Sequence, residues 1–182
     1  MESFGAAVID TDRVYREICT PGSPCINALA AEFGDGILLP DGSLDRKSLG
    51  ARVFSDPDAR HRLNTISHAY ILAETQRRIA CAEADGYDAV VVDAPLLFEA
   101  KFDRFCDITV GVVAPTEERI SRIVSRDGIT HDAAEKRIGA QTGDNELRCK
   151  CDFIIENHGD LDGFISRVRS FYINAVGDGV RS

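Results

Sequence analysis

Acidic side chains directly follow two of the apolar runs in this sequence. Asp10 and Asp12 come after the run at residues 6–9, and Asp93 comes after residues 89–92. Because parallel strands end at one edge of their sheet, where ligands bind, we expect these carboxylates to face one crevice. A carboxylate there can accept the proton of a hydroxyl group or hold a magnesium-bound water molecule. The alternative is that each aspartate only caps the helix that follows it.

Basic side chains gather on a predicted helix further along the chain. Arg119, Arg122 and Arg126 are three and four residues apart, which places them on one helix face. Arg137 follows on the next predicted helix. Planar guanidinium groups suit phosphate oxygens, so this pair of helices could close as a lid over a nucleotide. The alternative is a solvent-exposed face whose charges pair with neighbouring glutamates.

Two further polar side chains are candidates for a binding site. Glu99 directly follows the apolar stretch PLLF, where it could bind a substrate or begin a helix. His68 lies in the middle of a long predicted helix, beside Ile66 and Tyr70. This setting favours a histidine that packs in the core over a catalytic one.

The composition is typical of a globular protein. Of the 182 residues, 44% are hydrophobic and 28% are charged, which suits an α/β domain with a sizeable core. The net charge of −9 argues against a surface that binds nucleic acid, but it allows a local basic pocket. No apolar run is long enough to cross a membrane and no signal peptide is evident, so we expect a cytoplasmic protein without membrane partners.

The six cysteines predict no metal centre. Cys149 and Cys151 form a C-x-C pair, and no second pair follows at a spacing typical of zinc sites. We expect reduced thiols in the cytosol, with a metal or redox role as the alternative.

Apolar runs alternate with helical patterns along the chain. Strands are predicted at residues 6–9 and 89–92 and within 107–115 and 151–159. Helices are predicted at residues 12–20, 24–33, 46–54, 58–84, 116–127, 130–141 and 160–176. Near-continuous apolar strands between helices indicate a parallel sheet that is covered by helices on both faces.

Local signals set the boundaries of these helices. Ser23 and Asp56 are placed to cap two of them, the second with Pro57 at its first position. Within the longest helix, apolar side chains recur at steps of three and four residues and predict one buried stripe, made of Leu63, Ile66, Tyr70 and Ala73.

A series of short motifs resembles the dephospho-CoA kinase family. In chain order they are VIDTDRVYREI, PGSP, FGDGILLPDGSLDRKSL, VFSDPDAR, PLLFE, RIVSRDGIT, RIGAQ and CDFIIENHGDL. Each motif alone is weak, but the ordered set, which spans roughly residues 4–170, is specific.

The resemblance implies a three-layer α/β fold of the P-loop kinase type, with a parallel sheet flanked by helices. It implies one domain over residues 1–182, with a helical CoA-binding lobe at about 24–78 and a lid at about 119–141. The implied reaction passes the γ-phosphoryl group of ATP to the 3′-hydroxyl of dephospho-CoA, which is the last step of coenzyme A synthesis. ATP and Mg²⁺ are the implied cofactors, and the partners are small molecules.

The resemblance also suggests roles for the acceptor side of the site. Asp12 corresponds to the base near the 3′-hydroxyl, and Arg16 to a residue that holds the substrate. We expect Glu99 to assist in substrate binding and Asp93 to hold a magnesium-bound water molecule, with no metal ligand that binds directly.

On the donor side, the lid arginines correspond to residues that contact ATP. Arg122, Arg126 and Arg137 are implied to bind its phosphates. Asn157 and Gly159, in the motif ENHG, are implied to lie near the adenine.

The chain departs from the family pattern at two places. Family members commonly have His-Pro where this chain has His68-Ala69, a change that weakens any specific role for His68. The family also begins with a strand and a phosphate loop, G-x-x-x-x-G-K-[ST], and no glycine in this sequence is followed by Lys-Ser or Lys-Thr. We therefore expect the first strand and the loop to be missing.

The missing loop predicts impaired catalysis. Losing several charge-assisted contacts to the phosphates, at about 1.5–3 kcal/mol each, removes most of the affinity for ATP. A misplaced start codon is the explanation we favour, and a gene fragment or a non-catalytic remnant that binds CoA or nucleotides in a regulatory role are the alternatives. The reading frame upstream of Met1 distinguishes them. A related nucleoside kinase is disfavoured by the insert PGSP…LLPDGSLDR.

Overall fold

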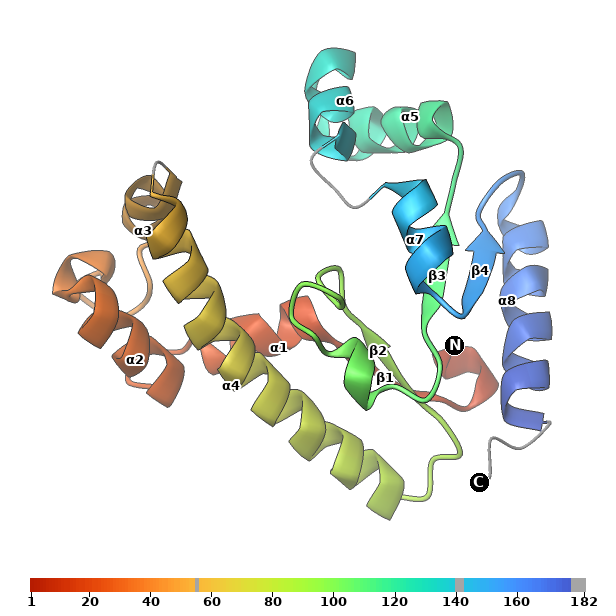
Figure 1. The fold of residues 1–182 in the computed structure, drawn as a ribbon, viewed down its shortest axis with the longest axis horizontal. Coiled ribbons are helices and arrows are strands. Elements are labelled where there is room, and N and C mark those ends of the chain that lie inside the picture. Colours follow the sequence, from red (N-terminus) through yellow and green to blue (C-terminus); the bar gives the residue numbers. More distant parts are fainter. Residues whose placement is uncertain (55, 140–142, 178–182) are drawn as a thin grey trace. The chain divides into compact units, whose positions relative to one another are not determined.

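Figure 1 shows the computed structural model of the chain, an α/β protein. The structure describes residues 1–54, 56–139 and 143–177. They divide into two compact units, Met1–Phe102 and Asp103–Ser182. None of the helices in these described ranges combines the length and the apolar character that a membrane span requires.

The first unit is built on two parallel strands. β1 (Ala7–Asp10) pairs with β2 (Val90–Asp93), with Ala7 opposite Val90 and Asp10 opposite Asp93. The long connection between the strands carries the helices of this unit (Figure 1), which are α1 (Thr11–Ile18), α2 (Pro24–Phe33), α3 (Arg46–Phe54) and α4 (Pro57–Ala84). Short 3₁₀ turns lie at Glu2–Phe4 and Asp35–Ile37.

Capping side chains begin two of these helices, as the sequence predicts. The Ser23 hydroxyl accepts a hydrogen bond from the Ile26 backbone N–H at the start of α2. The Asp56 carboxylate accepts hydrogen bonds from the next N–H groups of α4, and Pro57 occupies the first position of that helix. Each cap satisfies backbone donors that have no partner within the helix.

The core of the first unit lies where α2, α3 and α4 meet. Its buried members are Cys25, Leu29, Phe33, Ile37, Leu49 and Ala59. Leu63, Ile66 and Tyr70 pack against this cluster, which confirms most of the predicted stripe. Ala73 does not belong to it and is exposed, because a single methyl group loses little in water.

The buried positions of α4 are instead occupied by small side chains. They are Ala59, Ser67, Thr75 and Ala82. Small residues let neighbouring elements approach the helix closely, but two of these four are polar. A search for apolar periodicity therefore passes over Ser67 and Thr75.

A network of charges joins α1 to α4. The Glu74 carboxylate accepts hydrogen bonds from Arg77 and Arg78, each at 2.8 Å. Arg78 also donates to Glu17 of α1 at 2.5 Å. The hydrogen bonds from Arg77 and Arg78 lower the pKa of Glu74 from its ordinary value of 4.5 to about 2.

We expect this network to make stability depend on acid pH. Because the pKa of Glu74 is lower in the folded state, its contribution is complete above pH 4.5 and is lost as the pH falls towards about 2. Urea unfolding at several pH values should therefore show a steeper loss of stability for the native chain than for Glu74→Gln. Glu83→Gln, an exposed glutamate of the same helix, is the control. Parallel curves for the native chain and Glu74→Gln would contradict the prediction.

The second unit repeats the parallel pairing. β3 (Val110–Val113) pairs with β4 (Phe153–Glu156), with Val110 opposite Phe153. The other elements are a 3₁₀ turn at Asp103–Phe105 and the helices α5 (Thr116–Asp127), α6 (His131–Gly139), α7 (Asp144–Lys150) and α8 (Leu161–Gly177). α5 ends at Asp127, the boundary that the sequence predicts, and Gly128 follows it in the left-handed conformation. The predicted extension of the following helix over residues 140–141 lies outside the described residues.

The strands are less covered than their apolar sequences suggest. Val112 of β3 is 51% exposed, and Val90–Val92 of β2 are half-buried. Strands of a parallel sheet with helices on both faces are normally buried on both sides. Each two-stranded sheet therefore leaves part of its apolar surface open.

Candidate active site

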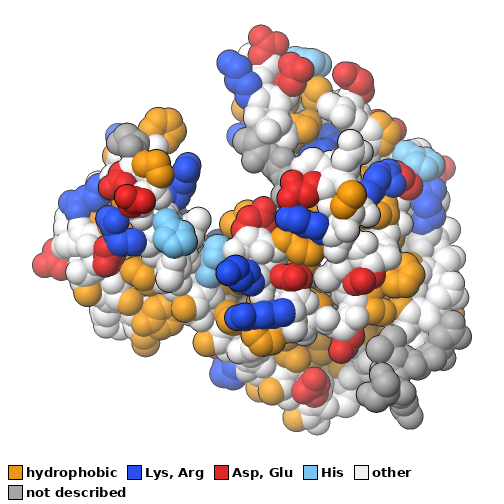
Figure 2. Space-filling view, in the orientation of Figure 1, with side chains coloured by type: hydrophobic (Ala, Val, Ile, Leu, Met, Phe, Trp, Pro, Cys, Tyr) orange, Lys and Arg blue, Asp and Glu red, His pale blue; other side chains and the backbone are white. Residues whose placement is uncertain are grey.

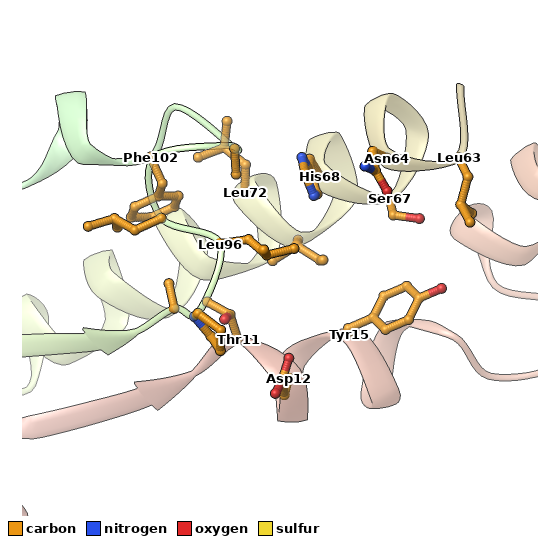
Figure 3. A pocket seen from close by; sticks show the side chains of 15 residues that line it. Thr11, Asp12, Tyr15, Leu63, Asn64, Ser67, His68, Leu72, Leu96 and Phe102 are labelled. Atoms are coloured by element: carbon orange, nitrogen blue, oxygen red, sulfur yellow. The ribbon is translucent and has the colours of Figure 1, made fainter. Parts of the chain in front are cut away.

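A pocket with a volume of about 260 Å³ lies beside the carboxyl end of β1 (Figure 3). Three segments of the first unit form its wall: the start of α1, the middle of α4 and the loop that follows β2. The loop contributes apolar side chains, among them Leu96 and Phe102. The two helices contribute the polar groups, which are Thr11, Asp12, Tyr15, Asn64, Ser67 and His68.

Asp10 and Asp12, which the sequence presents together, have different positions. The Asp10 carboxylate caps α1 and accepts a hydrogen bond from the Arg13 backbone N–H at 3.0 Å. The capping alternative is therefore confirmed for Asp10. Asp12 is the second residue of α1, and its side chain lines the pocket (Figure 3). Of the two, Asp12 is the one that can meet a ligand there.

Asp93 adds a third negative charge to this region. It lies opposite Asp10 across the sheet, and the Thr11 hydroxyl donates to its backbone carbonyl at 2.9 Å. Packing around the carboxyl raises the pKa of Asp93, and the charges of Asp10 and Asp12 raise it further. In the described part of the chain, no three His, Cys, Asp or Glu side chains are grouped so that they could bind a metal ion directly.

Arg16 and Glu99 lie near the pocket but do not line it. Arg16 donates to the Asp12 backbone carbonyl at 3.2 Å, and its guanidinium lies 4.0 Å from the Asp10 carboxylate. The loop that contains Glu99 follows β2, and the Glu99 carboxylate is close enough to His68 to act on its pKa. The roles predicted for Arg16 and Glu99 stay predictions.

His68 lines the pocket, so the prediction that it packs in the core is wrong. Burial lowers the pKa of His68, although the Glu99 carboxylate acts in the opposite direction. The imidazole is therefore neutral near pH 7 and can both donate and accept a hydrogen bond. A signal was present in the sequence, because Asn64, Ser67 and His68 are spaced to form a polar face on one helix.

Tyr15 is a second pocket residue that sequence reasoning missed. Burial and the neighbouring Cys19 raise the pKa of Tyr15 to about 12, while Ser67 acts weakly to lower it. The phenol is therefore neutral. Its ring lies across from Ser67 in Figure 3.

The predicted lid arginines lie in the second unit, where two of them share one acidic partner. Arg126 donates to the Asp127 carboxylate at 2.7 Å, and Arg137 of the next helix donates to the same carboxylate. Arg119 pairs with Asp144 at 2.9 Å. The alternative of a basic face paired with acids therefore describes these arginines in this structure. Arg122 pairs with the neighbouring Glu118, as that alternative expects, whereas the partners of Arg119, Arg126 and Arg137 are aspartates.

Arg122 and Asn157 are brought together. Arg122 donates to Glu118 at 2.8 Å and reaches the Asn157 backbone carbonyl at 3.4 Å. Gly159 follows β4 with a φ of 77°, which favours glycine.

On the face drawn in Figure 2, acidic and basic side chains alternate over the surface.

None of the six cysteines, all of which lie in the described ranges, forms a disulfide bond. The sulfur atoms of Cys19 and Cys25 lie 3.9 Å apart.

Comparison with known proteins identifies the family. The dephospho-CoA kinase family profile matches residues 1–163. A dephospho-CoA kinase of Symbiobacterium thermophilum is 39% identical over 173 residues, which cover 95% of this chain and 72% of the relative. One from Geobacter metallireducens is 44% identical over 160 residues, which cover 87% of this chain and 79% of the relative.

Solved structures agree with this result. A dephospho-CoA kinase from Campylobacter jejuni is 25% identical, with a TM-score of 0.70 over 97% of this chain and 88% of that one. The crystal structure of TT1252 from Thermus thermophilus is 27% identical, with a TM-score of 0.74 over 95% of this chain and 86% of that one. The chain therefore belongs to the dephospho-CoA kinase family.

Proposed function

We propose that this protein phosphorylates the 3′-hydroxyl of dephospho-CoA with ATP, in the cytoplasm, and that the pocket beside β1 holds the acceptor. The observation that carries the proposal is the position of Asp12 in the wall of a pocket at the end of a strand, in a member of this family. Of the acids at the two strand ends, only Asp12 lines this pocket.

Asp12 is the proposed general base. A carboxylate within hydrogen-bond reach of a hydroxyl group can accept its proton as the oxygen attacks phosphorus. The neutral His68 orients the acceptor by hydrogen bonding, and Leu96 and Phe102 exclude water from one end of the pocket. Arg16 and Glu99, just outside the pocket wall, hold the charged and polar parts of the substrate that extend beyond it.

The acids around β1 and β2 suit an indirect contact with Mg²⁺. Burial raises the pKa of Asp93, and repulsion by Asp10 and Asp12 raises it further; a nearby cation relieves this repulsion. Oxygen ligands of this kind are the ones that Mg²⁺ prefers, commonly through water molecules. When bound with ATP, the ion neutralises charge on the phosphates. Asp93 is the residue proposed to hold one of its water molecules.

The second unit is proposed to bind ATP. Arg122, Arg126 and Arg137 suit its phosphates, and the Asp127 carboxylate that two of them now share competes for the same guanidinium groups. Asn157 and Gly159 are proposed to lie near the adenine. About residues 119–141 would act as the lid, and about residues 24–78 as the CoA-binding lobe of a single domain.

A non-catalytic protein that binds CoA or nucleotides is the second candidate. The observation in its favour is that two of the arginines proposed for ATP, Arg126 and Arg137, both bind the Asp127 carboxylate in this structure. Turnover of ATP and dephospho-CoA by this chain separates the two candidates.

Binding of dephospho-CoA tests the acceptor site itself. At a hundred times its dissociation constant, a ligand of the folded state adds about 2.7 kcal/mol to the free energy of unfolding. We expect dephospho-CoA to raise the melting temperature of the native chain accordingly, and His68→Ala to need a higher concentration for the same shift. His61→Ala, an exposed histidine of the same helix, is the control. No shift at millimolar dephospho-CoA would refute the proposed function.

A further inference from the structure

A buried hydroxyl group without a hydrogen-bond partner lies in the pocket wall. Ser67 is 7% exposed, and within the described residues its Oγ forms no hydrogen bond of ordinary geometry, although it lies close enough to the Tyr15 phenol to lower the pKa of Tyr15. Serine and threonine in helices often donate to the carbonyl four residues earlier, as Thr65 of the same helix does to His61 at 2.9 Å. Ser67 does not. An unpaired buried hydroxyl destabilises the folded protein, so this position is unfavourable for stability alone.

The surroundings of Ser67 indicate what kind of group it could meet. Figure 3 shows Ser67 beside Asn64 on α4, with His68 on the same helix and Tyr15 of α1 across from it. None of the described residues that line the pocket is Lys or Arg. Phosphate groups are normally bound by such cations, so the part of a ligand that lies beside Ser67 is uncharged.

We propose that Ser67 is a specificity-determining residue whose hydroxyl binds a neutral hydrogen-bonding group of the acceptor substrate. The proposal rests on the proposed function, because it takes this pocket as the site of dephospho-CoA. Several parts of that molecule have the required chemistry: the edge of the adenine, the ribose hydroxyls, and the amides and hydroxyl of the pantetheine arm. Any of them supplies the partner that the Ser67 Oγ lacks in the protein itself.

Thr75 provides a matched comparison on the same helix. Its Oγ1 is also buried and unpaired within the described residues, and its side chain is fully buried. Thr75 does not line the pocket. Removal of either hydroxyl should therefore leave the folded protein at least as stable as before, but only removal of the Ser67 hydroxyl should weaken binding.

The test is a calorimetric titration of dephospho-CoA into the native chain, Ser67→Ala and Thr75→Val, with thermal unfolding of all three. We expect Ser67→Ala to bind about 3- to 10-fold more weakly without melting at a lower temperature, and Thr75→Val to bind like the native chain. A merely structural role for Ser67 would lower the melting temperature. Unchanged affinity in Ser67→Ala, when the native chain binds, overturns the inference alone. If the native chain does not bind dephospho-CoA, the inference and the proposed function are both refuted.

Competition with fragments then identifies the partner group. Adenosine and pantetheine are titrated against dephospho-CoA in the native chain and in Ser67→Ala. A weaker effect of adenosine in the variant assigns the Ser67 hydroxyl to the adenine or its ribose, and a weaker effect of pantetheine assigns it to an amide or the hydroxyl of that arm. Equal inhibition of both proteins by both fragments overturns the inference.

Discussion

A protein of these 182 residues is expected to bind dephospho-CoA but to phosphorylate it about 10²–10⁴ times more slowly than the same chain with a phosphate loop added before Met1. The reason is the cost of holding the donor. A phosphate loop gives ATP several charge-assisted hydrogen bonds, and losing two of them at about 1.5–3 kcal/mol each corresponds to a rate loss of this size. The arginines of the second unit cannot replace backbone N–H groups that surround the β-phosphate.

A chimera provides the comparison. A strand and a G-x-x-x-x-G-K-[ST] loop of the family pattern are fused before Met1, and turnover of ATP with dephospho-CoA is measured for both proteins. In thermal unfolding, ATP with Mg²⁺ should raise the melting temperature of the chimera and change that of the native chain little. A chimera in which the loop lysine is alanine controls for the added length. Equal turnover of the 182-residue chain and the chimera would contradict the prediction.

Asp12→Asn is expected to lower kcat by about 10²–10⁴-fold while the affinity for dephospho-CoA changes less than about threefold. The amide keeps the shape of the side chain but cannot accept a proton from the hydroxyl group. Single-turnover measurements at high enzyme concentration are made with the native chain and with the chimera. They separate the effect of Asp12→Asn from the slow phosphoryl transfer expected without the phosphate loop.

Asp10→Ala is the control for Asp12→Asn. Asp10 caps α1, so its replacement should reduce the free energy of unfolding by about 0.5–2 kcal/mol. Its effect on kcat should be much smaller than that of Asp12→Asn. If the two variants lose kcat equally, Asp12 acts through the structure of α1 and is not the base.

Most elements of the fold could be predicted from the sequence because their signals are local. Ser23 and Asp56 cap helices, and Gly128 ends one, since each acts on backbone groups within a few residues. α7 was not predicted. Its seven residues have acids at the start and cations at the end, but no residue in it is buried, so no apolar stripe marks it.

The partners of charged side chains could not be predicted in the same way. The spacing of Arg119, Arg122 and Arg126 is a property of one helix, whereas the partner of Arg126 also binds Arg137 from the next helix. Which carboxylate a guanidinium meets depends on how helices pack, and an arginine spacing alone fits both a phosphate site and a set of ion pairs.

The sequence by itself determined the family, the order of the described helices and strands apart from α7, and the presence of acids at the ends of β1 and β2. Only the tertiary structure decided that Asp10 caps a helix while Asp12 lines a pocket, and that His68 and Ser67 face that pocket from α4. The physical reason is that a helix start or a strand depends on neighbours in the chain. Whether a polar side chain faces solvent, a ligand or the core depends on how α1, α4 and the loop after β2 pack around it.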